Sequence, residues 1–178
     1  MIDINTFSIE SLSEACSKLT SGQLPEWNRL PDLDIYMDQL ISLIKKYLTG
    51  YPGIDEKGIT SSMVNNYVKL GLVPAPTKKK YNRPHIACLI MISILKQILP
   101  IGVIKQLISP ENRNDEAYKA LYELFRTCAA DTGEAVSSAA LEAASQSENS
   151  KERLTLCAAL RAQAEQALAQ ELIACEET

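Results

Sequence analysis

Four polar residues near the middle of the chain follow the spacing i, i+3, i+4 and i+7, which places them on one face of a helix: Ser62, Asn65, Asn66 and Lys69. Asparagine offers a donor and an acceptor that match the edge of adenine in the DNA major groove, and lysine contacts phosphate. Asparagine is also a poor helix former, so an adjacent pair costs stability. The stripe therefore indicates base recognition, and the competing interpretation is that the two asparagines cap or bridge neighbouring loops while Tyr67 belongs to the core.

A basic, extended segment follows this helix. Pro74 and Pro76 exclude a helix there, and the next residues carry positive charge and an aromatic ring: Lys78, Lys79, Lys80, Tyr81 and Arg83. Lysines and a tyrosine hydroxyl supply phosphate contacts that position a protein on DNA without specifying sequence. We expect a short two-stranded turn with these residues at or beside its tip.

Charge divides the chain sharply. Residues 41–110 hold ten basic and two acidic residues, a net charge of +8, whereas the remainder holds eight basic and twenty acidic residues, a net charge of −12. Such a division is typical of a basic region with a polyanionic partner, and the alternative is a merely solvated basic surface.

Signatures of enzymes and of metal sites are missing. The sequence has no glycine-rich phosphate loop and no nucleophile elbow, and its single histidine, His85, cannot form a paired site. The five cysteines contain no Cys-x-x-Cys pair. We expect no catalysis, no cofactor and no metal, and a structural or phosphate-contacting role for His85.

Helices dominate the expected fold, which is mostly α. Periodicity and capping signals predict them at about 6–20, 32–48, 61–70, 84–99, 101–108, 114–130, 134–147 and 151–176. Thr60 is the expected N-cap and Gly71 the expected C-cap of the helix that carries the polar stripe. The helix from Pro84 to Leu99 is apolar on nearly every side and should form the core.

The order of helix, polar-faced helix, basic turn and buried helix resembles the winged helix-turn-helix of MerR-type regulators. Their pattern Thr-x-Arg-Tyr-Tyr-Glu-Lys-x-Gly-Leu is matched by Tyr67, Lys69, Gly71 and Leu72, whereas Asn65, Asn66 and Val68 depart from it. The resemblance implies a two-stranded wing over the basic segment, a recognition helix at Ser62, Asn65, Asn66, Tyr67 and Lys69, and dimerisation and effector sensing by the C-terminal region.

A closer resemblance, over about residues 24–108, is to an uncharacterised bacterial family named only as a domain of unknown function. It rests on the segments Leu24-Pro25-x-Trp27, Leu30-Pro31-Asp32, Met63–Lys69 and Lys78–Tyr81. Members are generally presumed to be transcriptional regulators, which implies the same role here.

Three regions result from these patterns: an N-terminal helix at 1–23, a winged-helix DNA-binding domain at 24–110, and an acidic helical region at 111–178 for dimerisation or an effector. We expect a cytoplasmic, homodimeric transcriptional regulator that binds double-stranded DNA and no membrane. The alternative is a helical interaction module whose basic face binds an acidic protein.

Overall fold

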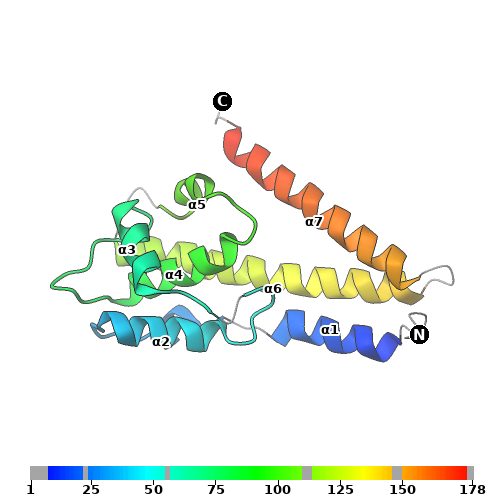
Figure 1. The fold of residues 1–178 in the computed structure, drawn as a ribbon, viewed down its shortest axis with the longest axis horizontal. Coiled ribbons are helices and arrows are strands. Elements are labelled where there is room, and N and C mark those ends of the chain that lie inside the picture. The colour runs from blue at the N-terminus through cyan, green and yellow to red at the C-terminus, as the bar shows by residue number, and fades with distance from the viewer. Residues whose placement is uncertain (1–7, 22–23, 55–56, 110–113, 146–149, 176–178) are drawn as a thin grey trace. The chain divides into compact units, whose positions relative to one another are not determined.

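The computed structural model describes residues 8–21, 24–54, 57–109, 114–145 and 150–175. This part of the chain forms seven α-helices and one short 3-10 helix (Figure 1). They are α1 (Ile9–Ser21), η1 (Trp27–Arg29), α2 (Met37–Leu48), α3 (Ser61–Lys69), α4 (Arg83–Leu95), α5 (Ile101–Ile108), α6 (Asp115–Ser145) and α7 (Lys151–Ala174). The expected helical class is confirmed.

Helix α4 is the centre of one of two compact units, which spans Gln23–Cys128. Every residue from Pro84 to Ser93 is buried, and α4 packs against both α2 and α5, while α2 also packs against α3. The neighbouring helices contribute fully buried aliphatic side chains, among them Leu40, Ile44 and Ile104. The prediction that this apolar helix forms the core is confirmed.

Helix α2 begins at Met37, later than the start predicted near Asp32. The reason is a contact with a distant segment. Ile35 exchanges two backbone hydrogen bonds of 2.8 Å with Tyr81, which holds residue 35 in an extended conformation. Gln39 then accepts the Tyr36 N–H at 2.9 Å and caps the helix.

The predicted two-stranded wing is wrong. Among the described residues no strand forms over the basic segment, and only two isolated bridges are present, Thr77 with Lys80 and Ile35 with Tyr81. Pro74 and Pro76 lack the N–H groups that a strand leading into the turn would donate. The backbone of Tyr81, on the other side of the turn, pairs with Ile35 instead of with that arm. The segment is a tight turn in an otherwise helical protein.

The second compact unit combines Met1–Gly22 with Ala129–Thr178. Here Cys16 of α1 and Ser137 of α6 are linked reciprocally: the Cys16 thiol donates to the Ser137 carbonyl at 3.8 Å, and the Ser137 hydroxyl donates to the Cys16 carbonyl at 3.3 Å. Helix α6 runs without a break where two helices, 114–130 and 134–147, were predicted. Gly133 lies inside α6. Because glycine has no side chain, the backbone of α1 packs directly against it, with the Leu19 carbonyl oxygen 2.9 Å from the point where a Cβ on Gly133 would stand.

The first turns of α6 belong to the unit that holds α4, although the sequence suggested a boundary at residues 110 and 111. Tyr122 donates its hydroxyl to the Pro25 carbonyl at 2.9 Å, and Glu123 accepts the Trp27 N–H at 2.7 Å. Arg126 donates to the Leu24 carbonyl at 3.0 Å. These bonds attach the Leu24–Trp27 segment to a helix about a hundred residues further along the chain.

Helix α7 buries none of its residues. Four of its leucines are largely exposed: Leu156, Leu160, Leu168 and Leu172. No helix in the described ranges has both the length and the apolar character needed to cross a membrane.

Candidate nucleic-acid interface

Helix α3 begins and ends where local capping signals predict. The Thr60 hydroxyl accepts the Met63 N–H at 3.3 Å, which confirms Thr60 as the N-cap. Gly71 follows the helix with φ of +75°, the left-handed conformation expected of a glycine C-cap.

The two faces of α3 differ completely in exposure. Val64 and Tyr67 are buried and Met63 and Val68 are half-buried, while the predicted polar stripe faces solvent at every position: Ser62, Asn65, Asn66 and Lys69. Both asparagine side chains are exposed, and no hydrogen bond joins them to another described residue, so the alternative in which they bridge loops has no support here. The stripe is a row of hydrogen-bonding groups available to a partner.

Tyr67 does not share that surface. It is only 5% exposed, and burial raises the pKa of its hydroxyl. Its backbone carbonyl accepts the Leu72 N–H at 3.0 Å, which fixes the chain as it leaves the helix. Tyr67 therefore anchors α3 to the core, and we leave it out of the contact surface.

The basic turn has an unusual backbone. The Lys80 N–H donates to the Thr77 carbonyl at 2.9 Å, and the two central residues, Lys78 and Lys79, have φ of +51° and +62°. Two consecutive positive φ values define a type I′ turn, which favours Asn-Gly. Residues with a Cβ are strained in this region, by roughly 1–2 kcal/mol each. Both lysines are exposed, so the turn presents two ammonium groups in spite of that cost.

The residues after the turn fix it to the domain. Tyr81 is buried, pairs with Ile35 through the backbone and meets the His85 ring edge-on, with ring centroids 5.3 Å apart. Arg83 donates to the Leu30 carbonyl at 3.1 Å and lies over the Trp27 ring. Neither Tyr81 nor Arg83 is presented to a partner as the sequence analysis predicted; both are positioning residues.

Lys80 is less exposed than Lys78 and Lys79, but it is not held against the domain core as Tyr81 and Arg83 are. Its ammonium lies 5.9 Å from the centre of the exposed Tyr36 ring, a cation–π contact that orients the side chain and leaves its charge in solvent. Lys80 is half-buried. Lys78 and Lys79 are thus the most accessible cations of the turn.

Lys105 was missed by the sequence analysis. Its ammonium lies 3.7 Å from the point where a Cβ on Gly71 would stand, so α5 brings a cation to the C-terminal end of α3. Positive charge stabilises a helix C-terminus, and Lys69 lies on the last turn of the same helix. No local pattern could reveal this pairing, because Lys105 and Gly71 meet only through the packing of α5.

His85 has a structural role, one of the two roles expected for it. It occupies the third position of α4, and its Nδ1 accepts the Asn82 N–H at 3.0 Å in a capping box. Nδ1 also contacts the Asn82 Oδ1, and Nε2 is buried without a hydrogen-bond partner among the described residues. Burial lowers the pKa of His85, and this effect outweighs the Ala75 and Asn82 backbone groups and the charges of Asp34 and Asp115, which raise it.

No three His, Cys, Asp or Glu residues in the described ranges lie close enough to hold a metal ion.

Comparison with known families matches residues 25–125 to the family described as Domain of unknown function (DUF1836). The chain belongs to this family. No curated protein and no solved structure matches the chain.

The DUF1836 domain contains α3, the basic turn and the core helix α4. Its limits, residues 25 and 125, enclose Trp27 and Glu123, whose hydrogen bond joins η1 to the first turns of α6. The family match therefore extends into the part of α6 that contacts η1.

Proposed function

We propose that the DUF1836 domain binds duplex DNA in a sequence-dependent manner and acts as a transcriptional regulator. Helix α3 would enter the major groove, with the polar stripe toward the base edges. Lys78 and Lys79 would contact the flanking phosphates, with Lys80 beside them. This arrangement needs no wing, because a tight turn is sufficient to present the lysines.

The exposed face of α3 is the observation that carries this proposal. A face that serves only solubility is usually filled with Glu and Lys, which are good helix formers. This face instead carries Ser62, Asn65 and Asn66, which are poorer helix formers, have no partner among the described residues, and can donate and accept hydrogen bonds. Such groups suit an adenine edge.

Electrostatics support the same surface. The net charge of +8 over residues 41–110 belongs to a chain whose overall charge is −4. The attraction to phosphate is therefore local and would be screened by salt.

A second copy of the chain would complete the regulator. One recognition helix with a few basic contacts binds weakly, and such domains usually pair on two half-sites. Helix α7 buries nothing in the single chain and exposes four leucines. The first half of α7 carries Lys151, Glu152, Arg153 and Arg161, a net charge of +2, and the second half carries Glu165 and Glu171, a net charge of −2. Two antiparallel copies of α7 would therefore bring halves of opposite net charge together.

Selection of duplexes from a random pool by the full chain tests the proposal. With the selected site, Asn65→Ala and Asn66→Ala should each weaken binding by about 1–3 kcal/mol and leave binding to random DNA nearly unchanged. Asn28→Ala is the matched control, because Asn28 is an exposed asparagine outside α3. Equal losses on selected and random DNA would contradict base recognition by α3.

The contribution of phosphate contacts is measured by the salt dependence. The double substitution Lys78→Ala and Lys79→Ala should weaken binding to all sequences and reduce the slope of log affinity against log salt by about two units. Substitution of Lys18 and Lys119, which are exposed on α1 and α6, makes the same change of charge and should leave the slope unaltered. Absence of binding to any duplex at about 50 mM salt would favour the alternative, a basic face for an acidic protein.

A further inference from the structure

Trp27 connects the residues that follow the basic turn with the first turns of α6. It is the only tryptophan in the sequence and is 4% exposed. The Cζ atom of Arg83 lies over the Trp27 ring, 5.7 Å from its centre, and the centre of the Tyr122 ring is 6.2 Å away at an interplanar angle of 55°. Both distances suit favourable cation–π and aromatic contacts. The Trp27 ring therefore contacts both the start of α4 and helix α6.

The first turns of α6 hold Trp27 in place. Glu123 accepts the Trp27 N–H at 2.7 Å through one carboxylate oxygen, and its other oxygen pairs with Arg126. The Tyr122 hydroxyl donates to the carbonyl of Pro25 at 2.9 Å, two residues before Trp27. Since η1 begins at Trp27, the position of η1 depends on these side chains of α6.

Helix η1 in turn holds Arg83. The Arg83 Nε donates to the Leu30 carbonyl at 3.1 Å, and Leu30 is the C-cap of η1, where its own N–H donates to the Trp27 carbonyl. The Arg83 Nη2 lies 3.6 Å from the Asp32 carboxylate, and the Arg83 side chain is only 18% exposed. The guanidinium thus attaches the residues just after the basic turn to η1.

The basic turn depends on such attachments. Its two central lysines have positive φ, which strains the backbone. A strained conformation persists only where the surrounding structure holds it. Two attachments follow the turn: Tyr81 pairs with Ile35 through the backbone, and Arg83 is bonded to Leu30. Weakening of either attachment should let the turn open more often.

We propose that Glu123 is a positioning residue for the basic turn, and that Trp27 and Arg83 are the links through which α6 and the turn act on each other. A change at Glu123 alters the support of the turn, and a partner bound to the turn alters the surroundings of Trp27. The coupling itself requires no DNA. Its regulatory consequence rests on the proposed function: α6 would adjust how firmly the exposed lysines of the turn hold the phosphates.

Amide hydrogen exchange of the full chain, followed by NMR, tests the coupling in the absence of DNA. Glu123→Ala removes the acceptor of the Trp27 N–H. It should speed exchange of the Lys80 and Tyr81 amides, whose hydrogen bonds close the turn and attach it to the domain, by about threefold to tenfold. These amides exchange by local opening, so their rates report on the turn and not on global unfolding.

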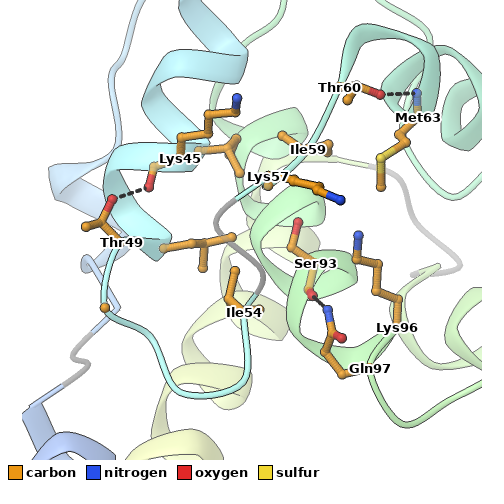
Figure 2. A pocket seen from close by; sticks show the side chains of 14 residues that line it. Lys45, Thr49, Ile54, Lys57, Ile59, Thr60, Met63, Ser93, Lys96 and Gln97 are labelled. Carbon is orange, nitrogen blue, oxygen red and sulfur yellow. Dashed lines mark hydrogen bonds between the residues drawn. The ribbon is translucent and has the colours of Figure 1, made fainter.

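Two control variants separate this effect from a general loss of stability. Glu116→Ala removes an exposed carboxylate from the same helix and should leave both amides unchanged. Ile59 is 3% exposed and lines a cavity of about 600 Å³ beneath the first turn of α3 (Figure 2), so Ile59→Ala should speed exchange in the core helix α4 and leave Lys80 and Tyr81 unchanged. Unchanged Lys80 and Tyr81 amides in Glu123→Ala, or equal acceleration of them in Ile59→Ala, would overturn the proposal.

Glu123→Gln is the conservative variant. Glutamine keeps an oxygen that can accept the Trp27 N–H and loses the ion pair with Arg126. It should therefore speed exchange in the turn less than Glu123→Ala. Equal acceleration by the two substitutions would overturn the bond to Trp27 as the link.

Fluorescence measures the coupling in the reverse direction, because Trp27 is the only tryptophan. Binding of the selected duplex should change the Trp27 emission, although the ring is too buried for DNA to contact it. Arg83→Lys keeps the charge and lacks the planar guanidinium, so it should reduce this response while a labelled duplex is still bound. A bound duplex with no change in the emission of the parent chain would overturn Trp27 as the link.

The two kinds of measurement separate the coupling from the proposed function. If the Lys80 and Tyr81 amides respond to Glu123→Ala and no duplex is bound under any condition, the coupling holds and the proposed function fails. If a duplex is bound and the two amides do not respond, the reverse is true.

Discussion

The Leu19 carbonyl oxygen lies 2.9 Å from the point at which a Cβ on Gly133 would stand. A real Cβ cannot approach a backbone oxygen so closely, so α1 and α6 meet at this position only because residue 133 is glycine. Two helices in contact through small residues approach each other more closely than helices with larger side chains. The Cys16 and Ser137 hydrogen bonds, one turn along each helix, complete the contact.

Gly133→Ala should therefore destabilise the α1–α6 unit by roughly 1–3 kcal/mol, in spite of the better helix propensity of alanine. Amide hydrogen exchange in α1 measures the effect. Gly102→Ala is the control, because Gly102 lies in α5 with no atom within 4 Å of its Cβ position, and it should stabilise the protein by about 0.4–1 kcal/mol. A stabilising effect of both substitutions would show that α1 does not pack on Gly133.

The core helix gives a second prediction. Ile90 is completely buried on α4, so Ile90→Ala should cost about 2–5 kcal/mol in the free energy of unfolding. Ile98, which follows α4 and is 52% exposed, provides the matched control, and Ile98→Ala should cost far less. Urea denaturation measures both. A loss below about 0.5 kcal/mol at Ile90 would contradict its place in the core.

Local signals explain which parts of the fold the sequence predicted well. Helix α3 was predicted within one residue, because Thr60 and Gly71 act on their immediate neighbours. The start of α2 was predicted wrongly, because it depends on a contact with a distant segment, that of Ile35 with Tyr81. The continuity of α6 was also predicted wrongly: the helix runs through Gly133, where the backbone of α1 packs against it.

The same distinction applies to the candidate interface. The exposed stripe of α3 follows from helical periodicity alone. The burial of Tyr81 and the contacts of Arg83 do not, since Arg83 donates to Leu30, a residue 53 positions earlier in the chain. Positive charge near a turn is visible in a sequence, but whether a cation reaches solvent or a carbonyl depends on tertiary packing.

Helix α7 leads to a prediction about assembly. Leu160 is 67% exposed in the single chain, and burial of such leucines between two copies would stabilise a dimer. We expect the full chain to sediment as a dimer at tens of micromolar, and Leu160→Lys to shift it toward monomer. Leu33→Lys replaces an equally exposed leucine in the other unit and should leave the dimer intact. A monomeric parent chain would contradict pairing through α7.

His85 predicts how stability depends on pH. Burial lowers the pKa of His85 from its usual value of 6.5, so the unfolded chain takes up a proton at a higher pH than the folded chain. Stability is then complete above about pH 6.5 and falls as the pH decreases below it. His85→Gln keeps an acceptor at the third position of the helix, where glutamine is a normal partner in a capping box, and removes the titration.

Urea unfolding at pH 7.5 and pH 5.5 measures this dependence. The parent chain should lose stability between the two values, and His85→Gln should lose less. Since the sequence contains one histidine, the difference between the two proteins isolates the His85 ring. An identical loss in both would show that the ring is protonated equally well in the folded and unfolded states.

The basic turn predicts a conflict between the stability of the domain and its binding to DNA. Lys78 and Lys79 both have positive φ, and strain of this kind is often retained where the side chains have a function. Replacing them with the preferred pair, Lys78→Asn with Lys79→Gly, should stabilise the domain by about 1–3 kcal/mol and weaken DNA binding by the loss of two phosphate contacts.

The alanine pair at the same positions removes the charges but keeps the strain, since alanine also has a Cβ. It should weaken DNA binding to the same extent and gain no comparable stability. Thermal unfolding and the salt slope, measured on both double variants, separate the two effects. If the Asn-Gly variant were more stable and bound DNA as tightly as the parent chain, the lysines would have no part in phosphate contact.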